Sequence, residues 1–475
     1  MNPERQQLPY WLFTFAVIFV LTLPVLIQDG MFMDAMLYTS VARNLAEGNG
    51  TFWFPHFNLI GLKGIPTFHE QPPLTAGIQS LFFVVLGDTM YTERIYVLCA
   101  LALHILLIIA IWRLIVHHHP ERKLGWLPLI LWIIVPVVFW SFRNNMHENT
   151  MGIFILLSVY LYLKSRSVFR YSDLYVVLSG VSIFLASFSK GIPGFFPVVI
   201  PFFHWICFRR TNLGRTIRDT SILILIPVVF YSAFMLFPVS RSSLILYVQQ
   251  SLFFRIHELP TVDNRFYIVF RLISELLLPF ILTAVLYFIL YFHSGYRSSR
   301  ETFMRSLFFL FLGLAGSVPM MLTLVQKSFY LTPVFPLFAI GLGILIAEPL
   351  SAWTRCVMTK KRSSVMTWIS GLLLAAVFLF SVSRIGRTSR EKEVLHDIHL
   401  IGNYLKGATE VSVPVALWND WSLQCYLMRY YKISLDQDHD DYFIVKKEIK
   451  NLVPPDYHKL EFTTLVYDVY LKTPE

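Results

Sequence analysis

The chain has 475 residues, of which 55% are hydrophobic, 16% aromatic and 15% charged. Soluble domains carry about 25% charged residues, so this composition excludes an ordinary soluble protein and indicates a chain embedded in lipid. The formal net charge of +10 would suit nucleic acid or an anionic surface, but the basic residues stand in short stretches between apolar runs, which favours membrane topology over a nucleic-acid partner.

Apolar runs of about 20 residues, the length a helix needs to cross ~30 Å of hydrocarbon, recur along the chain and predict about eleven transmembrane helices. Alternate loops are basic. By the positive-inside rule these loops are cytoplasmic, with the N-terminus inside and the C-terminus outside. The predicted helices begin near Trp11, Tyr91, Gly125, Asn149, Asp173, Ile192, Asp219, Phe266, Leu307, Phe329 and Val365. The basic loops include Arg122 and Lys123, Arg166 and Arg170, Arg215 and Arg218, Arg300 and Arg305, and Lys360 and Arg362.

A long non-cytoplasmic segment, residues 29–90, follows the first predicted helix. Within it, Leu74–Leu86 is apolar but too short to span a bilayer, which predicts an interfacial or re-entrant helix. Met33–Leu45 has apolar residues at helical spacing, with Asp34 near its start where the helix dipole favours an acid. It predicts a second interfacial helix.

The last segment, residues 384–475, differs in composition, since it carries 14 of the 30 acidic residues and alternates short apolar strings with turn residues. We expect strands at 411–418, 442–445 and 463–471, and helices at 390–405 and 422–431. The chain thus divides into a transmembrane catalytic module, 1–383, and a small soluble α/β domain outside the cytoplasm, 384–475.

Ionisable groups beside a membrane are costly, so they are functional candidates by default. On the non-cytoplasmic side of the predicted topology, several short strings combine such groups with proline, glycine or tyrosine. They are Asp34 to Tyr38 followed by Arg43; His69-Glu70-Gln71-Pro72-Pro73-Leu74; Arg94; Glu148; Ser189-Lys190-Gly191-Ile192-Pro193-Gly194; and Gln326-Lys327 followed by Tyr330-Leu331-Thr332-Pro333.

These strings, in this order, resemble motifs of the GT-C glycosyltransferases of the protein-mannosyltransferase superfamily, particularly the bacterial branch that includes the lipid A aminoarabinose transferase. The likeness covers about the first 350 residues. In that family an acid in an Asp-x-x-x-Tyr context after the first transmembrane helix is catalytic, and Asp34 with Tyr38 matches this pattern. The family's Glu-Lys-Pro-Pro-Leu string is mirrored from Glu70 to Leu74.

The second half of the likeness concerns cations near the donor phosphate. Lys190 begins an imperfect match to the family's Lys-Gly-Pro-x-Gly string, and Lys327 with Tyr330 matches a later Lys/Arg-x-x-Tyr string. Gln71 departs from the pattern, because related transferases commonly hold a lysine there. It can still donate a neutral hydrogen bond, and the missing charge would have to come from Lys190, Arg94, Lys327, Arg255 or a bound divalent cation.

The resemblance implies transfer of a hexose or pentose from a polyprenyl-phosphate donor to lipid A, a glycan or a protein, on the outer face of a bacterial inner membrane. Such a reaction leaves charge on the phosphate and makes the sugar oxocarbenium-like. Cations must hold the phosphate, while a carboxylate such as Asp34 takes the acceptor proton or orients an acceptor already ionised. A single displacement inverts the anomeric centre. Glu70 is the second catalytic candidate, and Tyr38, Glu148 and Tyr330 are other candidate site residues without an assigned role.

No nucleotide cofactor is expected, because a lipid-linked donor brings none. Glu70 and His257 offer oxygen and nitrogen ligands for a divalent cation, which is a hypothesis. Simpler interpretations also exist: Asp34 as a helix-start acid, and Lys190 as an interfacial lysine. The alternative functions are a transporter or flippase, with charges near the bilayer midplane, and an inactive envelope-assembly factor, for which Gln71 is the main argument.

Overall fold

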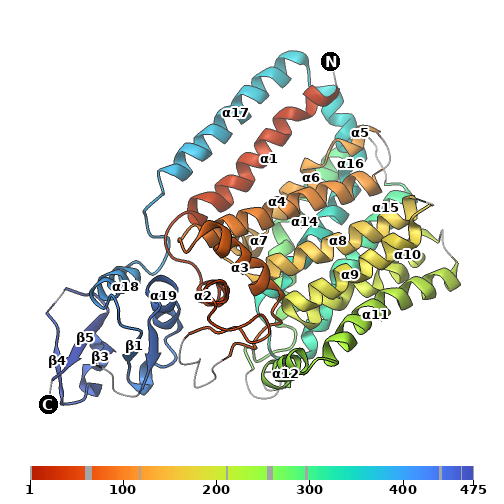
Figure 1. Cartoon of the computed structure of the whole chain (residues 1–475). Helices are drawn as coiled ribbons and strands as arrows, with labels where there is room; N and C mark the ends of the chain where they lie inside the picture. Colours follow the sequence, from red (N-terminus) through yellow and green to blue (C-terminus); the bar gives the residue numbers. More distant parts are fainter. Residues whose placement is uncertain are drawn as a thin grey trace.

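The structure is a computed structural model that describes residues 3–58, 67–116, 119–168, 170–209, 212–253, 260–294, 298–437, 441–461 and 463–473. Long helices form a bundle, with a small sheet domain at one end (Figure 1). Within these ranges, eight helical spans are long and apolar enough to cross a membrane. They are built on α1 (Pro3–Leu26), α4 (Thr92–Ile115), α9 (Ser172–Lys190), α11 (Leu213–Met235), α14 (Tyr267–Ser294), α15 (Arg300–Ser317), α16 (Phe335–Val357) and α17 (Lys360–Val382).

The prediction of a polytopic helical membrane bundle is confirmed. The predicted count of about eleven transmembrane helices is not, since eight helical spans in the described part of the chain have the length and composition to cross a membrane. The other three predicted segments are helical, yet Pro136 and Pro197 interrupt two of them and the third begins with His147 and Glu148. These segments are α6 (Trp126–Ile133) with α7 (Pro136–Ser141), α8 (His147–Ser167), and η1 (Ile192–Val199) with α10 (Ile200–Phe208).

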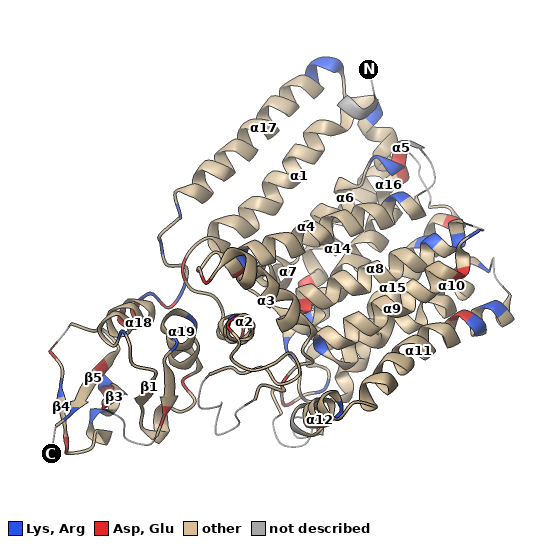
Figure 2. Cartoon of the chain, viewed as in Figure 1, with Lys and Arg blue, Asp and Glu red and all other residues tan. Residues whose placement is uncertain are grey.

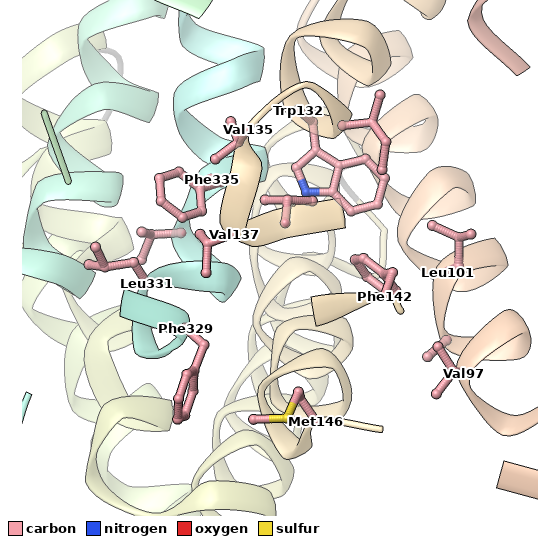
Figure 3. Close-up of a cluster of buried hydrophobic side chains, with 14 of the residues drawn as sticks. Val97, Leu101, Trp132, Val135, Val137, Phe142, Met146, Phe329, Leu331 and Phe335 are labelled. Atoms are coloured by element: carbon pink, nitrogen blue, oxygen red, sulfur yellow. The ribbon is translucent and has the colours of Figure 1, made fainter. Parts of the chain in front are cut away.

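The corner between α6 and α7 fills the space between α4 and the start of α16. Figure 3 shows Trp132 and Phe142 on the side of Leu101 in α4, and Val137 beside Phe335 in α16. The rings of Trp132 and Phe142 meet edge to face with centroids 5.3 Å apart. All of these side chains are buried, so the interrupted helix is part of the core.

Small residues let α15 and α16 approach closely. A side chain at Gly313 would come within 2.6 Å of the Phe338 ring, and one at Gly341 within 3.1 Å of the Ser306 carbonyl oxygen. The Ser306 hydroxyl donates a hydrogen bond to the Gly341 carbonyl at 2.8 Å. In lipid, packing and interhelical hydrogen bonds of this kind hold helices together, because lipid tails are as apolar as leucine.

Two helices predicted in the first long loop occur where the sequence places them. They are α2 (Met33–Ala46) and α3 (Leu74–Leu86), which pack on each other at the end of the bundle nearest the sheet domain (Figure 1). The remaining short helical segments are α5 (His119–Arg122), α12 (Pro238–Tyr247), η2 (Val248–Phe253), η3 (Val318–Leu322) and η4 (Ser328–Val334).

The C-terminal residues form a five-stranded sheet in the order β2-β1-β3-β5-β4. Strand β1 is parallel to β2 and β3, and β5 is antiparallel to β3 and β4. The strands are β1 (Glu410–Ser412), β2 (Ser434–Asp436), β3 (Tyr442–Lys446), β4 (Tyr457–Lys459) and β5 (Tyr467–Lys472), with helices α18 (Lys392–Tyr404) and α19 (Trp421–Tyr431) and the turns η5 (Val415–Leu417) and η6 (Lys447–Leu452). The small α/β fold predicted for this part is confirmed.

Some predicted strand limits were wrong. The strand expected over 411–418 ends at Ser412, because Pro414 lacks the N–H that a continuing ladder needs and starts the turn η5. The strand expected over 463–471 begins only at Tyr467. Strands β2 and β4 were not predicted, since three residues carry no measurable period.

Helix α19 of the sheet domain packs directly on α2. The Arg43 guanidinium donates hydrogen bonds to the carbonyls of Met428 and Arg429 at 3.0 and 3.1 Å. The Tyr426 hydroxyl donates to the Met31 carbonyl at 2.8 Å. The Arg429 guanidinium pairs with Asp88 at 2.7 Å and with buried Glu93 at 2.9 Å. The domain is therefore joined to the first loop and the start of α4 by buried polar contacts.

Candidate active site

The N-terminus of α2 supplies Asp34 and Tyr38. They lie four residues apart, and so on one face of the helix, with Asp34 in the first turn and Tyr38 fully buried. Burial raises the pKa of Tyr38 well above its ordinary value. The negative charges of Asp34, Glu148 and Glu70 raise this pKa further, so the three carboxylates lie within electrostatic reach of one phenol.

The turn before α8 holds α2 in place. The Asn144 side chain accepts a hydrogen bond from the Phe32 backbone N–H at 2.7 Å, where α2 begins, and the Asn145 amide donates to the Thr39 hydroxyl at 2.8 Å. Two residues further on, the His147 ring stacks on Tyr38 with centroids 3.9 Å apart. The first turn of α8 therefore sets the position of the tyrosine.

Lys190, at the C-terminus of α9, is bound to the same group. Its ammonium forms an ion pair with the Glu148 carboxylate at 2.9 Å and donates to the Tyr38 hydroxyl at 3.5 Å, and both partners of the ion pair are buried. It also lies 5.3 Å from the Tyr38 ring centroid and 5.7 Å from that of Tyr330. At these distances both rings attract the ammonium through cation–π interaction.

Gly191 ends α9 and lets the chain turn sharply after Lys190. Its φ of +93° lies in the left-handed region that favours glycine, and an added Cβ would stand 2.0 Å from the Tyr247 hydroxyl. The string from Lys190 to Gly194 is thus needed for its backbone shape as well as its charge.

A cavity of about 510 Å³ opens beside these residues. One part of its wall is polar, with Glu70, Gln71, Glu148, Lys190 and Tyr330. Much of the rest is apolar and comes from η1, α15 and η3, including Phe195, Phe196, Val199, Ala315, Pro319 and Met320. Asp34 is not among the lining residues. The cavity therefore suits a molecule with a polar head and a hydrocarbon tail.

The string around Glu70 is anchored at both ends. The His69 ring lies 3.2 Å from the Trp53 carbonyl oxygen, and the His69 carbonyl accepts a hydrogen bond from Ser251 at 2.7 Å. Beyond the two prolines, the Thr75 hydroxyl donates to the Ser189 carbonyl at 3.2 Å, next to Lys190. These contacts bring Glu70 and Gln71 to the end of α9.

Helix α19 of the sheet domain also approaches this site. Burial raises the pKa of the Cys425 thiol, and the charges of Asp34 and Glu70 raise this pKa further. Cys425 therefore lies within electrostatic reach of two of the predicted site acids.

Other predicted residues stand elsewhere. Arg94 is buried in α4, where it pairs with Glu93 at 2.9 Å and donates to the Gln28 carbonyl at 2.7 Å. Lys327 is exposed at the start of η4, and neither residue lines the cavity. Arg255 and His257 lie outside the described residues.

Sequence reasoning missed His147 and Asn145, which touch α2 directly. The signal available was their position one to three residues before Glu148, in a break between apolar segments. Tyr247 was also missed, because nothing in the sequence pairs it with Gly191.

Divalent cations prefer oxygen ligands such as the carboxylates here. However, the described ranges contain no group of three or more His, Cys, Asp or Glu side chains placed to hold a metal ion. The residues that the structure describes do not make a metal site by themselves, and no step below passes through one.

The molecule is an integral membrane protein with the GT-C fold. This fold is identified by the similarity of the chain to solved structures. About 97% of the chain matches 97% of ArnT from Cupriavidus metallidurans bound to undecaprenyl phosphate, with a TM-score of 0.65 and 12% identity. ArnT in the apo state gives a TM-score of 0.63 at 14% identity and the same coverage. An apo oligosaccharyltransferase from Archaeoglobus fulgidus gives 0.53 at 11% identity, over 91% of this chain and 62% of that one. No family model and no curated protein matches the sequence.

Proposed function

We propose that this protein is a membrane glycosyltransferase that moves a sugar from a polyprenyl phosphate to an acceptor outside the cytoplasm. The cavity beside Lys190 is the observation that carries the proposal, because it joins a polar, charged part to an apolar part within one wall. The GT-C fold, shared with an ArnT structure that holds undecaprenyl phosphate, supports the same function.

The distribution of charge supports the orientation. Figure 2 shows Lys and Arg gathered at the end of the bundle that holds the N-terminus, α5 and the start of α17, while the sheet domain lies at the opposite end. By the positive-inside rule the first end is cytoplasmic. The site and the domain formed by residues 384–475 then face the outside of an inner membrane. Single cysteines at Thr51 and in the C-terminal domain should react with the same impermeant reagent, and opposite reactivity would overturn this topology.

In the proposed reaction the acceptor oxygen attacks the anomeric carbon while the bond from that carbon to the phosphate oxygen breaks. The bonding electrons leave with the polyprenyl phosphate, and the acceptor proton passes to Asp34 as general base. Lys190, Gln71 and the Tyr330 hydroxyl bind the phosphate, and the apolar wall binds the first isoprene units. Attack opposite the leaving group inverts the anomeric centre.

The charges around Lys190 indicate how Glu148 takes part in the proposed reaction. Asp34, Glu70 and Glu148 carry three negative charges and Lys190 one positive charge, a formal sum of −2 that opposes an incoming phosphate. We infer that the phosphate replaces Glu148 as the partner of Lys190. Arg255 stays a prediction as a further cation.

The decisive experiment measures transfer from a polyprenyl-phosphate sugar by two variants of the purified protein. Asp34→Asn keeps the size of the side chain but not its basicity, so we expect kcat to fall by about 10²–10⁴-fold. Lys190→Ala should mainly raise the KM for the donor. An Asp34→Asn enzyme within a few-fold of the parent removes Asp34 as the base, and a folded parent protein without transfer on any donor supports an inactive assembly factor.

We propose only the chemical classes of the substrates: the sugar is a hexose or pentose, and the acceptor is lipid A, a glycan or a protein.

A transporter would keep its charged groups near the middle of the membrane. Here Glu148 and Lys190 stand at helix ends, in the first turn of α8 and the last turn of α9. This placement favours chemistry at one membrane face over transport through the bundle.

A further inference from the structure

A second cavity lies at the other end of the bundle from Lys190. It has a volume of about 330 Å³ and lies between the C-terminal ends of α4, α8 and α10 and the N-terminal ends of α9 and α15. A neighbouring cavity of about 590 Å³, at the starts of α9 and α11, shares Ser172 and Arg215 with it. These walls are helix ends, so the cavities stand at the depth of lipid head groups.

Arg166 forms part of the wall of the first cavity. Its side chain is 10% exposed, and one guanidinium nitrogen, Nη2, pairs with buried Asp219 at 3.1 Å. The Nε donates to the Ser165 hydroxyl at 2.9 Å. The other terminal nitrogen, Nη1, is buried and has no hydrogen-bond partner within the described ranges. A buried donor without an acceptor is unfavourable, so a ligand oxygen that reached Nη1 would satisfy it.

Arg215 stands between the two cavities. It donates to the Ser172 hydroxyl at 2.8 Å and forms no ion pair with any carboxylate that the structure describes. By contrast, Arg305 pairs with Glu301 at 2.8 Å, and Arg218 pairs with Asp173 and Asp219. Arg215 is exposed and has no ion-pair partner among the described carboxylates, so its charge is available to an anionic ligand.

The combined lining carries an excess of positive charge. The five arginines are Arg166, Arg170, Arg215, Arg218 and Arg305, and the carboxylates that line the cavities or pair with these arginines are Asp173, Asp219 and Glu301. Five positive and three negative charges leave a formal surplus of two. The starts of α9 and α11 add the positive ends of two helix dipoles.

The same cavity is apolar on its other side, where Leu114, Ile115, Leu163 and Phe208 line it. A free inorganic anion gains nothing from such a surface, whereas the acyl chains next to a head group do. We propose that these cavities bind the phosphate of an anionic phospholipid, with Arg166 and Arg215 as its ligands. Basic pockets between helices at this membrane face suit such head groups.

The experiment measures lipid binding by the purified full-length protein in detergent. Phosphatidylglycerol should bind, seen as a retained adduct in native mass spectrometry and as a rise in the thermal midpoint with lipid concentration. Phosphatidylcholine should have little effect. Arg215→Gln should weaken phosphatidylglycerol binding about fivefold or more, and Arg215→Lys less. Arg215→Gln breaks no ion pair, so the variant should fold.

The matched control is Arg362→Gln, which removes the same charge from an exposed residue in the first turn of α17, at the same end of the bundle. It should bind phosphatidylglycerol like the parent. Equal loss in both variants would reduce the effect to general surface charge and overturn the site, as would full binding by Arg215→Gln. If inorganic phosphate alone raises the midpoint as much as phosphatidylglycerol does, the lipid assignment is wrong. None of these readouts depends on glycosyl transfer.

Discussion

Replacing Arg429 tests whether the C-terminal domain holds the helix that carries Asp34. Arg429 is 3% exposed and pairs with Glu93, which is fully buried, and with Asp88. It also donates to the Thr89 carbonyl at 2.8 Å and lies over the Phe83 ring. In Arg429→Ala, both carboxylates lose this partner where α19 meets the α3–α4 connection, next to the carbonyl of residue 429 that accepts a hydrogen bond from Arg43 of α2.

The expected size follows from the burial of Glu93. Removing one partner of a buried ion pair costs about 3–5 kcal/mol, because the other charge stays buried without compensation. In the variant Glu93 still has its ion pair with Arg94 at 2.9 Å, so we expect a loss of stability at the lower end of this range, about 3 kcal/mol. Such a loss corresponds to about a hundredfold faster hydrogen exchange for amides that exchange when α19 separates from α2. The kcat of transfer should fall with it, while Arg429→Lys should recover part of both.

The control is Lys459→Ala in the same domain. Lys459 pairs with Asp468 at 2.9 Å but is half exposed, so its removal should cost about 0–1 kcal/mol and leave exchange in α2 unchanged. Unchanged exchange in α2 of Arg429→Ala, with the sheet intact, would refute a role for the domain in holding α2.

Two further predictions concern the site itself. In Gly191→Ala, a Cβ at positive φ would meet the Tyr247 hydroxyl, so we expect a loss of about 1–3 kcal/mol of stability and a higher KM for the donor. The control is Gly371→Ala, which has no atom within 4 Å of the new Cβ and should change neither quantity. Equal effects of the two variants in thermal melts and donor kinetics would contradict the strain argument. Burial lowers the pKa of His69 below its ordinary value of 6.5, against hydrogen bonds to Trp53 and Thr67 that raise it. The unfolded loop therefore takes up the proton first, and stability that is present above about pH 6.5 is lost as the pH falls below it. Proteolysis of the first loop should accelerate between pH 7.5 and 5.5 in the parent and much less in His69→Gln; the same acceleration in both would exclude His69 as the cause.

The helices of the first loop could be predicted closely because their patterns are local. Met33 begins α2 and Leu74 begins α3, as the spacing of apolar residues and the length of the apolar run indicate. The interrupted span at Pro136 shows the limit of this reasoning. Its core role depends on contacts with α4 and α16 that no local pattern contains.

The site shows a similar division. Motif order predicts Asp34, Glu70 and Lys190 as candidates, but the ion pair between Lys190 and Glu148 depends on the packing of α8 against α9. Arg94 was predicted as a phosphate ligand from its side of the membrane alone. The sequence does not reveal which face of α4 it occupies, and the structure places it against Glu93 instead.

The contact between Arg43 and Arg429 joins positions 386 residues apart in the chain. During biosynthesis α2 emerges early, whereas α19, which packs on it, is translated much later and, in the proposed topology, has to cross the membrane before it can fold there. The segment bearing Asp34 thus acquires its full set of neighbours only after α19 has been made and has reached the same side of the membrane. An unfinished chain would hold the motif but not the finished site.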